Sequence, residues 1–363
     1  MGAPKPEFTL PTMGDVTKAA GTNGYTSVST FSGCGGSSTG YKLAGFNVAY
    51  AAEFDLDAVA AYHLNYPTTP MFAEDIKNLS GEHVLKELGM GVGDLDLLEG
   101  SPPCSKFSVN GGRQKMWNQT TWADSDSRVQ ADVEDLFFEF TRLVREIQPR
   151  MFCAENVPGL RMGVVKGYFK MIVDDLTAAG YRVAVYEVDA QWCGVPQVRR
   201  RLFFTGVRRD LPVERIDPPV PAPYRYTMCD ALPHLGEDAT LHMTFGWTTI
   251  KRPIACATRA APTIARLGIG GGTAGEAQLS NAGIADTHDD PPGVPPVGSI
   301  YDKRTIRPRF ISIPELKVLA SFPVDFQLEG SWKNQWARIG NAVPPLMAQA
   351  VAGKVREALD ACR

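Results

Sequence analysis

The sequence contains one cysteine whose setting could activate it as a nucleophile. Cys104 follows Pro102 and Pro103, which come soon after the apolar segment Leu95–Leu98. A thiolate held by rigid prolines at the carboxyl end of a parallel strand would lie where such sheets bind their ligands, and it would be the strongest nucleophile in the chain. Because most cysteines are simply small buried residues, this interpretation depends on the groups that accompany Cys104.

A carboxyl group follows the next apolar segment. Glu155 and Asn156 come directly after Met151–Ala154. If the two segments are neighbouring strands, Glu155 could reach the same substrate atom as Cys104, and burial would raise its pKa toward a proton-donating role. The alternative is a Glu-Asn pair that caps a helix.

Two arginines precede a further apolar segment. Arg199 and Arg201 lead into Leu202–Thr205, and the alternation of a strand would place both side chains on one face. Two arginines that point into a cleft suit an anionic group or a developing negative charge. Two arginines on a solvated edge are the alternative.

A glycine-rich turn indicates a cofactor that contains a nucleoside. The segment Thr26–Phe31 runs into Gly33, Gly35 and Gly36, and a second apolar segment ends at Glu53. Glycines let the backbone approach a ligand closely, and a carboxylate at the end of the second strand can accept from both hydroxyls of a ribose. A plain tight turn is the alternative for the glycines taken alone.

A further acid, Asp75, could accept from an adenine amino group, or it could be an ordinary solvated loop residue. The combination is more informative than any single residue. Four separate strand ends each offer a plausible functional group, in one order and on one side of one sheet. Unrelated structural roles would rarely line up in this way, so the pattern favours one shared site.

The elements that must position these residues follow the rhythm of a doubly wound, mostly parallel sheet over the first 220 residues. Apolar residues between Val133 and Val144 recur at spacings of three and four, which predicts an amphipathic helix. We therefore expect an α/β, Rossmann-like fold. The predicted strands are Thr26–Phe31, Val48–Ala52, Leu95–Leu98, Met151–Ala154, Arg182–Val188 and Leu202–Thr205.

The rhythm breaks at a proline-rich stretch, Leu211–Tyr224, which is typical of a linker. An irregular region with glycine and proline clusters follows, and Ile313–Ser321 and Pro345–Ala358 are predicted helices, the latter with prolines where a helix tolerates them. The predicted organisation is an N-terminal tail over 1–24, a catalytic domain over 25–222, a small irregular domain over 223–306 and a C-terminal segment over 307–363.

Composition narrows the class of protein without selecting a partner. The chain has 363 residues, 44% of them hydrophobic and 21% charged, and a formal net charge of -3, so any polyanion must be held by local basic patches. We expect no signal peptide and no membrane insertion, because no apolar run reaches ~18 residues. The seven cysteines include no C-x-x-C pair, which favours a reducing compartment and argues against a metal site.

The ordered motifs resemble those of the DNA cytosine-5 methyltransferase family, from about Tyr25 to Ala352. The glycine turn is similar to the family's first cofactor motif. The other matching motifs are the nucleophile motif at Pro103-Cys104, the acid motif at Glu155-Asn156-Val157, the arginine motif at Gln197-x-Arg199-x-Arg201 and the last motif at Gly340-Asn341-Ala342-Val343-Pro344.

The resemblance implies roles for individual residues and a class I methyltransferase fold with a small target-recognition domain. S-adenosylmethionine would be held by Phe31, Gly33, Gly35, Gly36, Glu53, Phe54, Asp75, Ile76, Pro103, Asn341 and Ala342. The catalytic set would be Cys104, Glu155, Arg199 and Arg201. DNA would be contacted by Ser108, Arg113, Gln197, Lys251, Arg252, Arg259 and Arg266.

The implied reaction transfers a methyl group from S-adenosylmethionine to carbon 5 of a cytosine flipped out of duplex DNA, through an adduct between Cys104 and carbon 6, and leaves S-adenosylhomocysteine. No metal is needed. The resemblance also implies a monomer in the cytoplasm of a bacterial or phage-infected cell, and it leaves open a companion restriction endonuclease.

Two departures from the family pattern and several rivals remain. Ser105 stands where glutamine is usual, and the segment Met116–Ala123 resembles an insertion. An RNA cytosine-5 methyltransferase would share the chemistry and the fold. A nicotinamide-dependent oxidoreductase explains the glycine turn but not the other motifs, a zinc deaminase lacks its H-x-E and P-C-x-x-C signatures, and an inactive relative would not need both Cys104 and Glu155.

Overall fold

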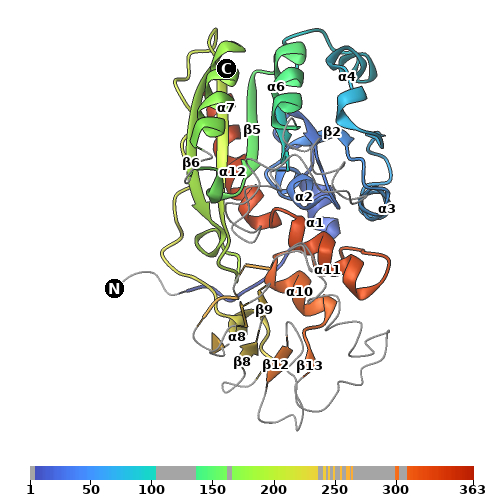
Figure 1. Cartoon of the computed structure of the whole chain (residues 1–363), viewed down its shortest axis with the longest axis vertical. Coiled ribbons are helices and arrows are strands. Elements are labelled where there is room, and N and C mark those ends of the chain that lie inside the picture. The colour runs from blue at the N-terminus through green and yellow to red at the C-terminus, as the bar shows by residue number, and fades with distance from the viewer. Residues whose placement is uncertain are drawn as a thin grey trace, which may run out of the picture.

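The structure, a computed structural model, describes residues 5–103, 136–161, 166–235, 240–242, 244–245, 248–249, 254–255, 259–261, 263–264, 299–301 and 309–363. Its larger part is a seven-stranded sheet in the order β3-β2-β1-β4-β5-β7-β6 (Figure 1). Strand β7 is antiparallel to both of its neighbours, and the other pairs are parallel. The predicted α/β, mostly parallel fold is therefore confirmed.

The strands agree with the sequence pattern except at their ends. The predicted strand Leu95–Leu98 begins two residues later, and the last two predicted strands are longer than expected. Strand β3 has only two residues, too few to produce a recognisable alternation. The bounds are β1 Thr26–Thr30, β2 Asn47–Ala52, β3 Met71–Phe72, β4 Leu97–Gly100, β5 Met151–Asn156, β6 Tyr181–Asp189 and β7 Arg200–Arg208.

Helices cover both faces of the sheet. One face packs against α4 (Gly81–Leu88), α6 (Leu136–Ile147) and α7 (Lys166–Ala178), and the other against α2 (Gly36–Leu43) and α12 (Pro345–Asp360). The amphipathic pattern predicted for α6 is confirmed over its described part, because Phe137, Phe140, Leu143 and Val144 are buried in the core.

The carboxyl edge of the parallel strands is covered by shorter elements. They are α3 (Leu56–Asn65), the 3₁₀ turns η1 (Ile76–Asn78), η4 (Pro158–Arg161) and η6 (Ala190–Trp192), α10 (Ile313–Leu319) and α11 (Trp332–Asn341). The short helix α8 (Met228–Ala231) follows the proline-rich stretch. Helix α11 has no counterpart among the predicted elements, whereas α10 and α12 lie where helices are predicted.

The first 24 residues contain more structure than the predicted tail. Helix α1 (Met13–Ala19) begins with a capping box in which Thr12 and Asp15 satisfy each other's backbone amides. Its residue Val16 is fully buried in a cluster that also contains Phe322 and Trp336. This segment is therefore packed onto the C-terminal part of the chain.

Short strands lie in the predicted irregular region, in the lower half of Figure 1. Four of them form an antiparallel sheet in the order β11-β8-β12-β13, and β9 pairs with β10. Strand β13 belongs to this sheet although it lies beyond the predicted boundary at residue 306. The bounds are β8 Thr240–His242, β9 Thr244–Phe245, β10 Thr248–Thr249, β11 Ile254–Ala255, β12 Ser299–Tyr301 and β13 Arg309–Phe310.

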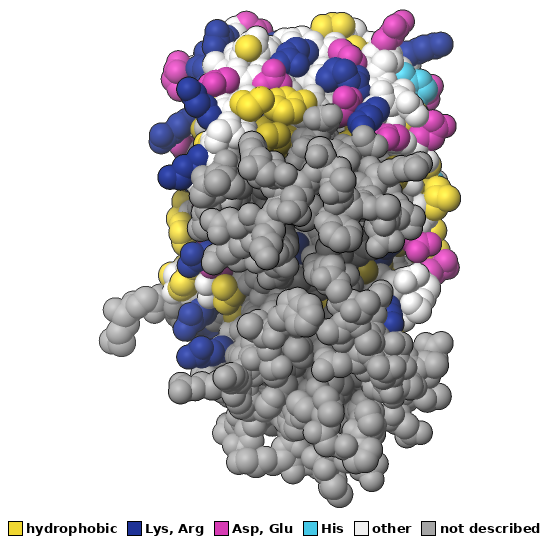
Figure 2. All heavy atoms as spheres, viewed as in Figure 1, with side chains coloured by type: hydrophobic (Ala, Val, Ile, Leu, Met, Phe, Trp, Pro, Cys, Tyr) yellow, Lys and Arg dark blue, Asp and Glu magenta, His cyan; other side chains and the backbone are white. Residues whose placement is uncertain are grey.

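On the face of the molecule in Figure 2, the described surface mixes basic and acidic side chains and does not segregate them. This mixture agrees with a net charge near zero. In the part of the chain that the structure describes, no helix is long and apolar enough to cross a membrane.

Two glycines of α2 permit an unusually close approach to the C-terminal helix. A Cβ atom on Gly36 would lie 2.6 Å from the carbonyl oxygen of Val343, and one on Gly40 would lie 2.4 Å from that of Pro345 and 2.5 Å from Cβ of Ala348. These are main-chain or short side-chain atoms that cannot turn aside. Any larger residue must push the two helices apart.

We predict that Gly40→Ala lowers the free energy of unfolding by about 2 kcal/mol or more, because overpacking outweighs the gain in helix propensity. Gly353→Ala is the matched control within α12, since nothing lies within 4 Å of a Cβ atom there. That control should raise stability by about 0.5–1 kcal/mol. Urea denaturation measures both variants, and equal effects would show that the helices are not in tight contact.

Candidate active site

The chain turns sharply after β1 because three residues adopt left-handed backbone conformations. Phe31, Gly33 and Gly35 have φ of 52°, 54° and 97°, and Gly35 is the N-cap of α2. Glycine adopts this conformation without strain. The first turn of α2 therefore lies directly beyond the end of β1, which presents backbone amides at the carboxyl edge of the sheet.

Glu53 faces this turn from the end of β2. Its carboxylate accepts hydrogen bonds from the backbone amides of Gly33 at 2.8 Å and of Phe54 and Asp55, each at 2.9 Å. Burial raises the pKa of Glu53, and these three amides oppose the shift. The neighbouring Phe54 side chain is 61% exposed, so its ring is accessible beside the carboxylate.

The C-terminal segment packs against the glycine turn, as the sequence analysis predicts. Helix α11 ends at Asn341, which is exposed, and the half-buried Ala342 lies against the position of Gly36. A guanidinium nitrogen of Arg338 lies 2.6 Å from the Asp55 carboxylate, and the carbonyl oxygen of Arg338 accepts from the Cys34 thiol at 3.7 Å. The two halves of the predicted cofactor site are thus joined by an ion pair.

The two residues predicted to contact the cofactor's base lie after β3. Asp75 is exposed and is the N-cap of η1, where its carboxylate accepts from the amide of Lys77 at 3.0 Å. Ile76 is buried. Both stand at the carboxyl edge of the sheet, on the same side as Glu53.

A buried carboxyl group that the sequence analysis missed lies beneath the glycine turn. Glu99 on β4 accepts hydrogen bonds from the hydroxyl groups of Ser29 on β1 and Ser37 on α2, the latter at 3.0 Å. Burial raises the pKa of Glu99 to about 7, with the charge of Glu155 adding to the shift. A charged residue inside the otherwise apolar β4 was the signal that could have identified it.

We predict that Glu99→Gln becomes more stable relative to the wild type as the pH rises. In the unfolded chain this carboxyl ionises near pH 4.3, but in the folded protein it keeps its proton to about pH 7. The folded state therefore loses stability between these two values, and glutamine removes this loss.

Urea denaturation measures the change in the free energy of unfolding that Glu99→Gln causes. This change should be about 2–3 kcal/mol more favourable at pH 8 than at pH 5. Glu87→Gln on the exposed surface of α4 is the control, because water surrounds that carboxyl in both states. A pH-independent effect of Glu99→Gln would contradict the assignment of a proton to Glu99.

The segment that leads to Cys104 is anchored by the next strand. After β4 the chain passes through Pro102 and Pro103, and the side-chain amide of Asn156 donates to the carbonyl oxygen of Pro102 at 3.0 Å. Strands β4 and β5 are parallel neighbours, with Gly100 paired to Ala154. Cys104 itself lies outside the described residues. The prolines that precede it and Asn156, which holds Pro102, lie at the carboxyl edge of the sheet.

The predicted acid and one predicted arginine form an ion pair. Nε of Arg201 lies 2.6 Å from the Glu155 carboxylate, and both side chains are 13% exposed. Strand β7 is antiparallel to β5, so the beginning of β7 lies beside the end of β5. The reversed strand direction therefore explains how two residues 46 positions apart meet at the carboxyl edge.

The expectation that Arg199 points into an open cleft is wrong. Arg199 is 2% exposed, and its guanidinium donates to the carbonyl oxygens of Gly340 at 3.1 Å and Ile264 at 2.8 Å. Burial lowers its pKa well below the ordinary value, and the charge of Arg201 contributes to that shift. Arg199 therefore joins the last motif to the irregular region and acts as a positioning residue.

Gln197 also needs correction as a predicted DNA contact. Its side-chain amide is 1% exposed, donates to the carbonyl oxygen of Leu319 at 3.3 Å and accepts from the amide of Ile264 at 3.2 Å. Because both ends of the side chain are occupied, Gln197 holds the irregular region in place.

Of the other predicted DNA contacts, Arg259 is exposed, and Ser108, Arg113, Lys251, Arg252 and Arg266 lie outside the described residues.

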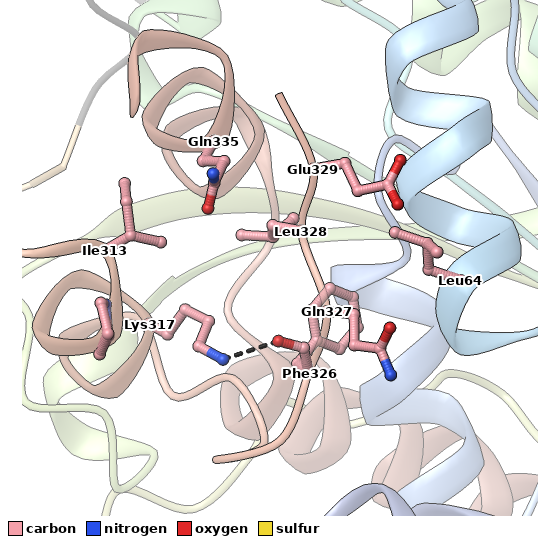
Figure 3. Close-up of a pocket in the computed structure, with 9 residues that line it drawn as sticks. Leu64, Ile313, Lys317, Phe326, Gln327, Leu328, Glu329 and Gln335 are labelled. Atoms are coloured by element: carbon pink, nitrogen blue, oxygen red, sulfur yellow. Dashed lines mark hydrogen bonds between the residues drawn. The ribbon is translucent and has the colours of Figure 1, made fainter. Parts of the chain in front are cut away.

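A cavity of about 320 Å³ lies apart from these residues, beside α10 (Figure 3). The ammonium group of Lys317 lies in it and donates to the carbonyl oxygen of Phe326 at 2.6 Å. None of the predicted site residues lines this cavity, so it contributes nothing to the argument for catalysis. Its lining is Leu64, Ile313, Pro314, Lys317, Phe326, Gln327, Leu328, Glu329 and Gln335.

The described residues contain no group of three or more His, Cys, Asp or Glu side chains that could hold a metal ion. The polar groups at the carboxyl edge of the sheet are instead the Glu53 carboxylate beside the glycine turn and the Glu155 carboxylate paired with Arg201. The first arrangement can bind a nucleoside, and the second can place a carboxyl group and a guanidinium at a substrate base.

Solved structures of methyltransferases share this fold. It is similar to that of a mutant of Spodoptera frugiperda DNMT2, with a TM-score of 0.56 and 16% identity over 93% of this chain and 99% of that one. It is also similar to Entamoeba histolytica methyltransferase EhMeth, with a TM-score of 0.57 and 15% identity over 92% of this chain and 98% of that one. The fold is that of the class I S-adenosylmethionine-dependent methyltransferases.

The sequence matches the C-5 cytosine-specific DNA methylase family over residues 25–357, and the chain belongs to that family. The protein is thus a DNA (cytosine-5)-methyltransferase. Type II methyltransferase M.XorII of Xanthomonas oryzae pv. oryzae is 28% identical over 92% of this chain and 84% of its own length. Type II methyltransferase M1.HphI of Haemophilus parahaemolyticus is 30% identical over 91% and 86%.

Proposed function

We propose that this enzyme transfers the methyl group of S-adenosylmethionine to carbon 5 of a cytosine in duplex DNA, and that Cys104 bonds covalently to the base during the reaction. The observation that carries this proposal is the ion pair between Glu155 and Arg201, next to the strand end from which the chain continues to Cys104. An acid beside a nucleophile suits a ring that is protonated on one side and attacked on the other.

The residues at the glycine turn fit S-adenosylmethionine. Glu53 offers a carboxylate for the ribose, and the exposed ring of Phe54 can stack on an adenine. When bound, the cofactor supplies an electrophilic methyl group. We assign to this site Phe31, Gly33, Gly35, Gly36, Glu53, Phe54, Asp75, Ile76, Pro103, Asn341 and Ala342.

The chemistry begins at carbon 6 of cytosine. The Cys104 thiolate forms a bond to carbon 6, and the carbon 5–carbon 6 π pair moves to the carbon 4–carbon 5 bond. The carbon 4–nitrogen 3 π pair moves onto nitrogen 3, which takes a proton from Glu155. The resulting enamine is nucleophilic at carbon 5 and accepts the methyl group. Loss of the carbon 5 proton to water then expels the thiolate, and the proton on nitrogen 3 returns to Glu155.

The target atoms are stacked inside a duplex, so the base has to leave the helix before it reacts. In the extruded position the base lies against Arg201, whose guanidinium Glu155 already orients. Arg199 does not contact the base in this proposal, because its guanidinium donates to the carbonyl oxygens of Gly340 and Ile264 and holds these two segments in position.

We assign DNA contacts to the predicted irregular region, residues 223–306, which we call the recognition region. Basic side chains there, including the exposed Arg259, are suited to phosphates and base edges. Since relatives are named Type II methyltransferases, we infer a modification role in the cytoplasm, in which a companion restriction endonuclease is the partner. The enzyme acts as a monomer in this proposal.

Label from methyl-labelled S-adenosylmethionine should appear on carbon 5 of cytosine in duplex DNA and not in RNA. Cys104→Ser should abolish transfer, and Glu155→Gln should lower kcat by about 10²–10⁴-fold, as expected for loss of a general acid. Cys362→Ser is the matched control, since this thiol lies at the end of the chain beyond α12.

Label on RNA alone would move the assignment to an RNA methyltransferase. Transfer by Cys104→Ser at the wild-type rate would contradict covalent catalysis. Absence of label on either nucleic acid, with the cofactor bound, would contradict methyl transfer altogether.

Glu53→Gln should weaken binding of S-adenosylmethionine by about 10–100-fold, the range for a lost hydrogen bond to a charged group. S-adenosylhomocysteine should lose a similar factor, because both molecules carry the same ribose. Titration calorimetry measures both affinities, with Glu82→Gln on the surface of α4 as the control. Unchanged affinities for Glu53→Gln would remove this residue from the cofactor site.

A further inference from the structure

The N-terminal residues 5–16, which we call the strap, lie before the part of the chain that matches the family. At the beginning of the strap, the ammonium group of Lys5 lies 2.7 Å from both carboxylate oxygens of Asp230 in α8. Asp230 also completes the capping box that starts α8 with Thr227. The strap therefore contacts the helix that the chain forms as it enters the recognition region.

Aromatic packing reinforces this contact. The ring of Phe8 meets the ring of Tyr226 edge to face at 4.9 Å, and Tyr226 meets Tyr224 at 5.4 Å. Lys5 lies 5.9 Å from the centre of the Tyr226 ring. The strap thus covers the end of the proline-rich stretch as well as α8.

The other half of the strap binds Val324 and Asp325, which follow α10 in the part of the chain after the recognition region. The carbonyl oxygen of Pro11 accepts from the amide of Val324 at 3.2 Å, and the amide of Met13 donates to the Asp325 carboxylate at 2.7 Å. Val16 is buried in the adjoining core. One short segment therefore connects both chain crossings between the catalytic sheet and the recognition region.

Hydrogen bonds, joined by short stretches of main chain, lead from α8 to the proposed catalytic pair. The amide of Met228 donates to the carbonyl oxygen of Arg259 at 2.9 Å, and Ala261 exchanges backbone hydrogen bonds with Pro196 and Val198 at 2.8 and 2.7 Å. The next residue along the chain, Arg199, binds Ile264 as described above. Arg201, two residues further, pairs with Glu155.

We propose that the strap is a positioning element that fixes the recognition region over the catalytic strand ends, and so sets the affinity for DNA and the choice of cytosine. The inference rests on the proposed function, because it takes residues 223–306 as the DNA-reading part. The contacts support it, because the strap binds Tyr226 and Asp230 on one side of the recognition region and Val324 and Asp325 on the other. The partly exposed Lys5–Asp230 pair contributes little to stability, so its role should appear in DNA binding.

The test compares the wild type with Lys5→Glu, Phe8→Ala and the combined variant on long duplex DNA of mixed sequence. Methylated positions are mapped by bisulfite sequencing, and KM is measured for DNA and for S-adenosylmethionine. The combined variant should raise KM for DNA about tenfold, equivalent to about 1.4 kcal/mol, and should blur site choice, while KM for the cofactor stays unchanged. Lys5→Arg, which keeps the charge, should behave as the wild type.

Arg150→Ala is the matched control, because it removes one partly buried ion pair, with Asp96, at the opposite end of the sheet. Hydrogen exchange of the amides of Met228, Ala261 and Ile264 should accelerate in the strap variants and not in this control. Unchanged DNA KM, site choice and exchange in the combined variant would overturn the proposal. So would equal changes in Arg150→Ala or a parallel loss of cofactor affinity.

The two proposals fail in distinguishable ways. A wild type that methylates no duplex DNA would refute the proposed function, and the exchange comparison would still decide whether the strap holds the recognition region. A wild type that methylates DNA, with strap variants that match it in every measurement, would refute the strap alone.

Discussion

The contact between α2 and α12 is the constraint on which the candidate active site depends. Without side chains at Gly36 and Gly40, the main chain near Val343 and Pro345 lies directly against the helix that follows the glycine turn. The last motif therefore reaches the turn from more than 300 residues away in sequence. The Arg338–Asp55 ion pair then fixes α11 beside Glu53, so the proposed cofactor site is built from both ends of the chain.

Strand direction has a comparable effect on the proposed catalytic residues. Because β7 is antiparallel, its first residues are delivered to the edge where the parallel strands end, and Arg201 meets Glu155. Glu99 faces the same side of the sheet, where burial raises its pKa to about 7 although the hydrogen bonds from Ser29 and Ser37 oppose that shift. The site therefore combines a paired carboxylate with a carboxyl group that holds its proton to about pH 7.

Much of the fold and the site could be predicted because the signals are local. Apolar runs that end in glycine, glutamate or proline predicted β1, β2, β4 and β5. The residues that follow two of these runs, Glu53 and Glu155, were predicted as site residues. The family motif pointed to Ala342, which lies against the position of Gly36 in the structure. These predictions needed only the order of elements and the rule that parallel strands end at one edge.

Features that depend on distant partners could not be predicted. Alternation places Arg199 and Arg201 on the same face, but only the fold shows that Gly340 and Ile264 enclose the first of them. The polar sequence before Gly24 gave no indication that Phe8 and Val16 pack onto segments more than 200 residues away. The hydroxyl donors of Glu99 likewise come from other elements.

Where residues 259–264 meet residues 196–199, the hydrogen bonds use mainly main-chain atoms of the recognition region. Ala261 contributes its amide and carbonyl, Ile264 does the same, and apart from the hydroxyl of Thr263 no side chain of this stretch donates to or accepts from residues 196–199 among the hydrogen bonds of the described residues. Such main-chain hydrogen bonds do not depend on side-chain identity, although the buried Ala261 and Ile264 must stay small or apolar. Recognition regions could therefore diverge, or recombine between related enzymes, without rebuilding the catalytic half, and chimeric enzymes with new targets are best joined outside residues 259–264.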